Sequence, residues 1–178
     1  MTHSVETAPT GRALCRACGE KIAKGERRFG ERLPNPFSDD GGEMTHWFHL
    51  ACAAYARPEP FLETIESVAD PIDGRDDLIR EAQAGVAHRR LPRLRGAERA
   101  TSARAACRQC KEPIAKDTWR LALAYYEDGR FSPSGFIHAT CAQPYLETTD
   151  VVPRLRHFSP ALTAEDLAEI DAAVHAPG

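Results

Sequence analysis

The sequence has no long hydrophobic run. No apolar stretch approaches the roughly 20 residues that a membrane-spanning helix requires. Residues 1–10 are polar and lack the apolar centre of a signal peptide. We therefore expect an intracellular protein without a membrane partner. In a reducing compartment, spaced cysteines bind metal more often than they form disulfides.

The sequence also has little net charge. Its 23 Lys and Arg residues against 26 Asp and Glu give −3 at pH 7, a balance that does not by itself indicate a nucleic-acid-binding protein. The charge is unevenly distributed, however. Residues 88–108 contain seven arginines and a single acid, Glu98, whereas the acids gather in residues 38–43, in 63–81 and beyond 147. The chain is locally basic and slightly acidic as a whole.

Cysteine is scarce, and all six cysteines fall in a repeat. The window "GRALCRACGEKIAKGERRF" (11–29) agrees with "ARAACRQCKEPIAKDTWRL" (103–121) at ten of nineteen positions. At an offset of 92, the first pair of cysteines matches the second, and at an offset of 89 an H-x-x-C motif recurs. The repeated residues are Cys15, Cys18, His49 and Cys52 in the first half and Cys107, Cys110, His138 and Cys141 in the second. A long-period repeat of this kind predicts two copies of one structural unit.

Each half therefore offers three thiolates and one imidazole. Four such donors in a tetrahedral array suit Zn²⁺ and leave no coordination position for water, which favours a structural role. The alternatives are buried free thiols, disulfides or a redox-active C-x-x-C pair. Two complete copies of the spacing favour two structural zinc ions per chain. His46 has no counterpart in the second half, so we expect a surface histidine or a DNA contact there and not a ligand.

Hydrophobic patterns predict the elements around these ligands. Strands are expected at 27–33, 44–50, 119–126 and 134–139, and helices at 75–88 and 163–174. Thr163, three residues before Asp166, is a capping signal for the last helix. We predict an α+β fold of two small zinc-stabilised units, each a short antiparallel sheet with a Cys3His zinc knuckle and flanking helices.

The expected domain organisation follows from the repeat and from the composition between its copies. We predict a flexible N-terminal tail at 1–10, a first unit at 11–88, a flexible Arg-rich linker at 89–102 and a second unit at 103–178. Pro92 and Gly96 interrupt the linker, which makes regular structure there unexpected.

The motifs around the ligands resemble the zinc finger of poly(ADP-ribose) polymerases (PARP-type), which is also found singly in a nuclear DNA ligase. "GRALCRAC" (11–18), "EKIAKGERRF" (20–29) and "HWFHLAC" (46–52) are similar to the family's G-R-A-x-C-x-x-C, I-x-K-G/D-x-x-R and W-Y-H-x-x-C patterns. The second half keeps "RAACRQC", "IAKDTWRLA" and "FIHATC". The resemblance implies binding to DNA strand breaks and ends, largely independent of sequence.

The resemblance also implies roles for single residues. The family's arginines hold backbone phosphates, and its apolar loop residues rest on the base exposed at a break. The matching arginines are Arg12 and Arg28 in the first half and Arg104 and Arg120 in the second. Met44 matches one apolar position, Asp40 stands at the other, and Phe37 and Phe131 are the nearby aromatic candidates. The ordinary alternatives are solvated arginines and phenylalanines packed within their own loops.

Three classes of function are compatible with these features. The first is a non-enzymatic, zinc-dependent DNA-repair protein that binds nicks, breaks or ends, works beside a repair enzyme and resides on DNA, in a bacterial nucleoid or cytoplasm or in a eukaryotic nucleus. The second is a protein-interaction adaptor that keeps the finger fold without affinity for DNA. An enzyme is the weakest, because closed Cys3His sites cannot activate water and 178 residues leave no room for a polymerase catalytic domain.

Overall fold

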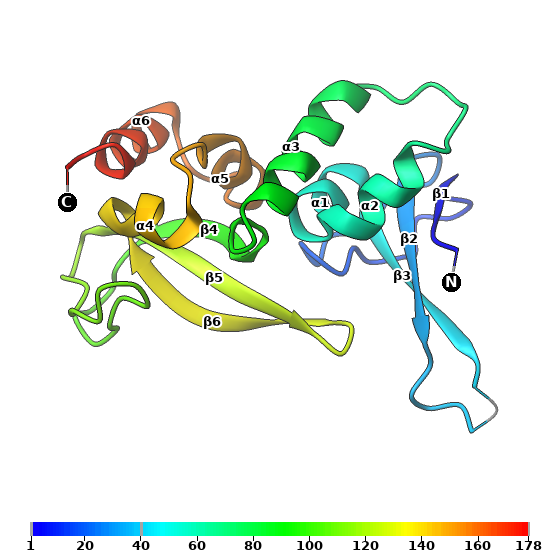
Figure 1. The fold of residues 1–178 in the computed structure, drawn as a ribbon, viewed down its shortest axis with the longest axis horizontal. Coiled ribbons are helices and arrows are strands. Elements are labelled where there is room, and N and C mark those ends of the chain that lie inside the picture. Colours follow the sequence, from blue (N-terminus) through cyan, green and yellow to red (C-terminus); the bar gives the residue numbers. More distant parts are fainter. Residues whose placement is uncertain (1, 40, 178) are drawn as a thin grey trace. The chain divides into compact units, whose positions relative to one another are not determined.

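The structure, a computed structural model, describes residues 2–39 and 41–177. The chain divides into two compact units, one of residues up to Ala87 together with Asp128–Arg130, the other of the remainder from His88 (Figure 1). Each unit contains a three-stranded sheet and several helices, which confirms the predicted α+β class. Among the described residues, no helix has both the length and the apolar character needed to cross a membrane.

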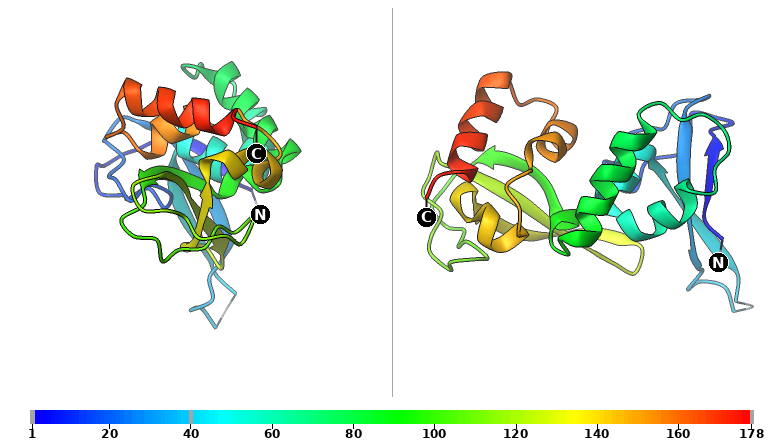
Figure 2. Two further views of the ribbon diagram at one scale, coloured as in Figure 1. Left: turned by 90° about the vertical axis from the view of Figure 1, so that its left-hand side faces the viewer. Right: turned by 45° about the horizontal axis from the view of Figure 1, so that its top comes forward.

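The first unit places three helices beside one antiparallel sheet. Its elements are β1 (Ser4–Thr7), β2 (Arg27–Pro34), β3 (Glu43–His49), α1 (Leu50–Ala56), α2 (Pro58–Ile65) and α3 (Arg75–Ala87), with the strand order β1-β2-β3. α1 packs on β2 and β3, and α2 and α3 pack on α1 (Figures 1 and 2). The core centres on Phe29, whose ring centroid lies 6.1 Å from that of Phe48 and 5.9 Å from that of Phe61. All three rings are fully buried.

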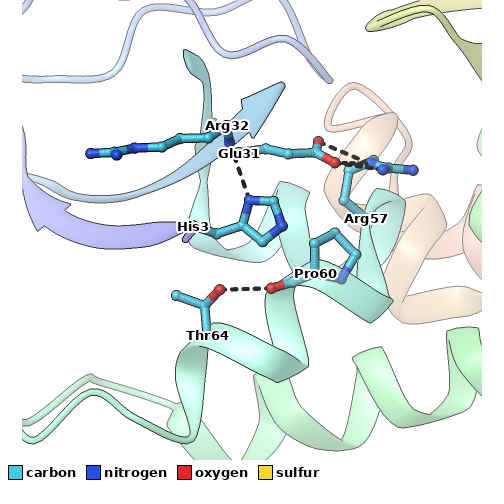
Figure 3. Close-up of polar contacts among 6 residues, drawn as sticks. All are labelled: His3, Glu31, Arg32, Arg57, Pro60 and Thr64. Atoms are coloured by element: carbon cyan, nitrogen blue, oxygen red, sulfur yellow. Dashed lines mark hydrogen bonds and ion pairs between the residues drawn. The ribbon is translucent and has the colours of Figure 1, made fainter. Parts of the chain in front are cut away.

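A polar contact joins β2 to the α1–α2 turn, and further ones lie beside it (Figure 3). Glu31, only 1% exposed, accepts hydrogen bonds from Nε of Arg57 at 3.1 and 3.0 Å and from its Nη2 at 2.5 Å. On the same strand, the backbone N–H of Arg32 donates to Nδ1 of His3 at 3.1 Å, and within α2 the Thr64 hydroxyl donates to the Pro60 carbonyl at 2.8 Å. Because a buried carboxylate without its partner is strongly destabilising, Arg57 sets the position of the α1–α2 turn on the sheet.

The second unit has the same sheet with a different helical cover. Its elements are η1 (a 3-10 turn, Leu91–Arg93), β4 (Leu94–Arg99), β5 (Trp119–Glu127), β6 (Arg130–His138), η2 (Ala139–Cys141), α4 (Ala142–Leu146), α5 (Val152–Phe158) and α6 (Ala164–Val174), with the strand order β4-β5-β6. α5 packs on β4, and α6 packs on α5 and η2 (Figure 2). The predicted capping box of α6 is present, with reciprocal bonds between Thr163 and Asp166 at 2.9 and 3.1 Å.

The structure differs from the expected flexible tail and linker. In the tail, β1 pairs with β2 residue for residue from Ser4 to Thr7. In residues 89–102, η1 leads into β4, which forms the edge of the second sheet, and Leu91 and Leu94 are each 1% exposed. The two segments are therefore structural parts of their units, and the division between the units falls after Ala87.

The two residues that suggested a break in the linker have structural uses. Pro92 lies in the first turn of η1, where a missing backbone N–H costs nothing. At Gly96, a Cβ atom would lie 2.6 Å from Oγ of Ser159, which accepts the backbone N–H of Ala97 at 3.1 Å. A glycine is thus required at this point for the close approach of α5 to β4.

The tail and the linker are the same element of the repeat. At the offset of 92, Glu6 matches Glu98 and Ala8 matches Ala100, and both alanines are buried. The N–H of Ala8 donates to the Glu26 carbonyl at 2.8 Å, as that of Ala100 donates to the Thr118 carbonyl at 2.9 Å. Each repeat therefore begins with an edge strand that lies before the first cysteine.

Candidate metal centres and the arginines beside them

The eight predicted ligands come together in two separate clusters of four. The first cluster holds Cys15, Cys18, His49 and Cys52, and the second Cys107, Cys110, His138 and Cys141. Within each cluster the ligand atoms all lie within 4.8 Å of one another. None of the six cysteines forms a disulfide. His46 belongs to neither cluster and is 3% exposed, so the expected surface histidine is wrong; its burial lowers the pKa of its imidazole.

The two clusters have matching geometry. Nδ1 of His49 lies 3.4 Å from Sγ of Cys18 and 3.8 Å from Sγ of Cys52. The corresponding distances from Nδ1 of His138, to Cys110 and Cys141, are also 3.4 and 3.8 Å. Ligands about 2.0–2.3 Å from a tetrahedral zinc ion are about 3.5–3.8 Å apart, so both clusters fit the ion.

Local structure delivers each pair of ligands. The turn of the first C-x-x-C closes with the N–H of Gly19 on the Cys15 carbonyl at 2.8 Å, and Gly19 has a φ of 78°. In the second C-x-x-C turn, the N–H of Lys111 donates to the Cys107 carbonyl at 2.9 Å, and Lys111 has a left-handed φ of 69° although it carries a side chain. The histidine is the last residue of β3 or β6, the second strand of each hairpin, and the last cysteine lies in the helical turn that follows, α1 or η2.

A second layer of contacts orients the histidines. Nε2 of His49 lies 3.3 Å from the carbonyl oxygen of Lys21, and Nε2 of His138 lies 3.2 Å from that of Pro113. A proton on Nε2 donated to the carbonyl leaves the Nδ1 lone pair for the metal, as in many zinc sites. The same tautomer is therefore selected in both units.

Each cluster contains one thiol that ionises readily. The hydrogen bond from Cys52 is the main cause that lowers the pKa of Cys15 to about 3, against the opposing effect of burial, and the same bond raises the pKa of Cys52. For Cys107 burial raises the pKa, but backbone N–H groups led by that of Cys110 outweigh it and bring the pKa to about 7. Burial is the first cause that raises the pKa of Cys141 to about 12. The other thiols lose their protons when a metal binds.

Two of the four candidate arginines are held by an acid and an aromatic ring. Nε and Nη2 of Arg28 donate to Oε1 of Glu6 at 3.2 and 2.6 Å, and its Cζ lies 3.5 Å from the centroid of Trp47. We call this arrangement an arginine clamp. The arginine is 6% exposed and approaches the ring as cation–π pairs do.

The second unit repeats the clamp. Nε and Nη2 of Arg120 donate to Oε1 of Glu98 at 3.0 and 2.5 Å, with Cζ 3.7 Å from the centroid of Phe136, and the arginine is 8% exposed. The two glutamates were not among the predicted site residues, although the offset of 92 relates Glu6 to Glu98 and is a signal that could have identified them. In each clamp the Nη1 group is the part of the guanidinium that does not bond the glutamate.

The remaining candidates lie in different surroundings. Arg12 and Arg104 are exposed beside the two C-x-x-C turns. Phe37, in the loop between β2 and β3, is 82% exposed, and Met44 on β3 is half-buried opposite Leu33. Asp40 lies outside the described residues.

Phe131 is not at a free loop tip. It lies in β6, half-buried, with its ring centroid 4.6 Å from that of Tyr126 and the guanidinium carbon of Arg95 4.5 Å from its own ring. The second unit therefore presents no counterpart of the exposed Phe37 at this position.

Comparison with known proteins agrees with this geometry. Residues 6–89 match the family described as the poly(ADP-ribose) polymerase and DNA-ligase Zn-finger region. Among curated relatives, poly [ADP-ribose] polymerase 1 of Gallus gallus is 30% identical over 137 residues, 67% of this chain and 13% of that protein. That of Oryza sativa subsp. japonica is 28% identical over 175 residues, 92% of this chain and 15% of the relative. The poly [ADP-ribose] polymerase of Drosophila melanogaster is 27% identical over 145 residues, 71% and 14% respectively. The chain thus spans about one seventh of the length of these relatives.

Proposed function

We propose that the chain is a member of the poly(ADP-ribose) polymerase and DNA-ligase zinc-finger family, which residues 6–89 match, and that its two zinc-stabilised units bind DNA at nicks, breaks or ends. Zinc has a structural role in this proposal, because both Cys3His clusters are complete without water. Recognition acts through backbone phosphates and exposed bases and has little sequence preference.

The observation that carries the proposal is the repeated pair of arginines beside each zinc centre. In both units one arginine is exposed next to the C-x-x-C turn, Arg12 or Arg104, and a second is fixed in a clamp, Arg28 or Arg120. Guanidinium groups suit phosphate oxygens because their N–H donors form a rigid fork. A clamped arginine offers only its Nη1 edge, so it makes a directional contact, whereas the exposed arginine supplies most of the free charge.

Base stacking would come mainly from the first unit. Phe37 is the large hydrophobic side chain with the greatest exposure among the described residues, at 82%, and Met44 lies on the strand that the same loop enters. An aromatic ring on an exposed base contributes about 1–3 kcal/mol. In the second unit, the Phe131 ring is already packed on Tyr126. In our proposal it therefore contacts a base with the edge of its ring, or after the β5–β6 hairpin shifts.

Charge supports a second candidate for the first unit. Residues 1–87 carry 10 Lys and Arg against 15 Asp and Glu, a balance of −5, whereas residues 88–178 carry 13 against 11, a balance of +2. A surface with net negative charge repels DNA at low salt. The alternative function is therefore an adaptor that binds another protein, with the first unit as its docking module.

No catalytic role is part of the proposal. The curated relatives are named as polymerases, and the match to their family concerns the zinc-finger region. A repair enzyme that processes the bound break is the partner we propose, and the protein would reside where the DNA is, in a nucleoid or a nucleus.

Fluorescence anisotropy with labelled DNA tests the proposal. We expect the zinc-loaded chain to bind nicked and blunt-ended duplexes more tightly than a covalently closed circle of the same sequence. If four arginines contact phosphates, the logarithm of the binding constant should fall with the logarithm of salt concentration with a slope of about −3 to −4. Equal and negligible affinity for all three DNA forms would favour the adaptor.

A further inference from the structure

A group of arginines in the second unit has no role in the zinc centres or the clamps. Residues 88–95 hold four arginines and no acid. Two of them stack on tyrosines. Cζ of Arg93 lies 4.3 Å from the ring centroid of Tyr125, and Cζ of Arg90 lies 4.9 Å from that of Tyr145. We call Arg90, Arg93, Tyr125 and Tyr145 the Arg–Tyr cluster.

Hydrogen bonds join the cluster into one unit. Nη1 of Arg93 donates to the hydroxyl oxygens of Tyr125 at 3.0 Å and of Tyr145 at 3.4 Å. The three side chains come from η1, β5 and α4, which are far apart in the sequence. Stacking and these bonds fix the plane of the Arg93 guanidinium, and its donors other than Nη1 remain for a ligand, so little conformational entropy is left to lose when a ligand binds.

The charge of the cluster is not neutralised within the protein. In residues 2–39 and 41–177, no ion pair involves Arg90 or Arg93. This distinguishes them from the clamp arginine Arg120, which pairs with Glu98. Both cluster arginines are half-buried, and Tyr125 is 45% exposed, so the cluster reaches the surface. A partly desolvated, uncompensated pair of cations is a binding site for an anion.

The position of the cluster indicates which anion. Arg93 immediately precedes β4, and the clamp acid Glu98 lies near the other end of that strand. Five residues of strand correspond to about 15 Å, or about four to five base steps of a DNA strand. On β5, Arg120 and Tyr125 are five residues apart and therefore lie on opposite faces of the sheet. A ligand that contacts both Arg120 and Arg93 has to pass around the edge strand β4, as a polyanion can and an isolated carboxylate cannot.

We propose that the Arg–Tyr cluster is a second phosphate-binding site, which holds a phosphodiester of the DNA that flanks the break. This inference extends the proposed function and rests on it for the identity of the polyanion. The cluster would make the second unit the stronger DNA-binding unit, and it contributes affinity that does not depend on the break itself.

Matched variants test the site. Arg93→Ala and Arg89→Ala remove the same charge from neighbouring positions, but Arg89 is exposed and has no aromatic partner in the described structure. Arg93→Lys keeps the charge and loses the planar set of guanidinium donors. Tyr125→Ala keeps every charge and removes the aromatic ring on which Arg93 stacks. Zinc content of two ions per chain and an unchanged melting curve show that each variant is folded.

For a nicked duplex with long flanks, we expect Arg93→Ala to weaken binding about tenfold, as for a lost charged hydrogen bond, and to reduce the salt slope by about 0.9. Arg93→Lys and Tyr125→Ala should also weaken it, and Arg89→Ala should weaken it least. If the wild type binds the nicked duplex but Arg89→Ala and Arg93→Ala weaken that binding equally, the proposed phosphate site is wrong. The proposed function is not contradicted by that result.

Continuous duplex separates the two proposals. If the wild type shows no preference for the nick, yet Arg93→Ala and Tyr125→Ala still weaken binding to continuous duplex more than Arg89→Ala does, the site is supported and break recognition fails. A wild type that binds no DNA overturns both. A competition experiment adds either polyglutamate or unlabelled duplex to the labelled complex. If polyglutamate displaces the labelled duplex as effectively as unlabelled duplex does, the site is overturned, because the surface then binds acidic proteins equally.

Discussion

Arg28 donates two hydrogen bonds to a single oxygen of Glu6, at 3.2 Å from Nε and 2.6 Å from Nη2. The acid lies on β1 and the arginine directly opposite on β2, so the pair also joins two strands. Its repetition as Arg120 and Glu98 makes the clamp a property of the fold unit. The clamp gives the arginine two roles, one in the sheet and one toward a phosphate, and these roles can be measured separately.

The first prediction concerns the clamp arginines and their exposed neighbours. Arg28→Ala and Arg120→Ala should each destabilise their own unit by about 1–3 kcal/mol, because a charge-assisted bond and a ring contact are lost together. Arg12→Ala and Arg104→Ala should leave the melting temperature unchanged and reduce the salt slope of DNA binding by about 0.9 each. Thermal unfolding and anisotropy titrations measure the two effects. A clamp variant that melts like the wild type would remove the structural role.

The second prediction is that each unit depends on its own zinc ion. Elemental analysis should find two zinc ions per chain, and a chelator should unfold both units, because zinc binding contributes about 10–16 kcal/mol in finger peptides. Cys52→Ser and Cys141→Ser should each retain one zinc ion and unfold only the unit that carries the substitution, as followed by amide hydrogen exchange. A chelated chain with the exchange pattern of the zinc-loaded protein would contradict this prediction.

Sequence reasoning identified the metal centres because their ligands occur in short motifs with fixed spacing. A C-x-x-C turn brings both sulfurs to one side wherever it occurs, and the two copies left no cysteine unassigned. The same holds for the capping box of α6, since Thr163 and Asp166 bond within one helical turn. Both features are local, so the sequence alone was sufficient.

The edge strands were missed because their partners are distant. "SVET" and "LRGAER" have no regular alternation of apolar and polar residues, and Pro92 and Gly96 suggested a flexible linker. Pairing with β2 and β5 gives these segments their structure. The surroundings of Phe131 and Arg93 were unpredictable for the same reason, because the aromatic and basic partners come from separate elements.

The third prediction compares two phenylalanines. Phe37 is exposed and Phe131 is packed, so Phe37→Ala should weaken binding to nicked DNA by about 1–3 kcal/mol without changing stability. Phe131→Ala should mainly lower the stability of the second unit, because it removes contacts with Tyr126 and Arg95. Anisotropy and thermal melts distinguish the two. Equal losses of affinity from both substitutions at unchanged stability would mean that Phe131 also reaches a base.

The fourth prediction uses the cap of α6. Thr163→Ala removes the oxygen that accepts the Asp166 N–H, at a cost of about 1 kcal/mol. Because α6 packs on α5 and η2, which contains the zinc ligand Cys141, the loss should appear in the second unit alone. Exchange rates in both units provide the measurement, and Thr101→Ala, at an exposed bend, serves as the control. A loss spread over both units would contradict independent folding.

The last prediction concerns β1, which lies in the segment that the sequence predicted to be a flexible tail. Deletion of residues 2–8 removes the whole edge strand, including Glu6, and the buried Ala8 that follows the strand. Arg28 then loses its acid, so we expect the first unit to be destabilised by at least about 2 kcal/mol and the second unit to melt as before. The same deletion should steepen the salt dependence of DNA binding, because the positive charge of Arg28 is no longer neutralised. Thr10→Ala, an exposed change outside the strand, should alter neither quantity. A deletion variant with unchanged melting and an unchanged salt slope would show that β1 contributes nothing to either role.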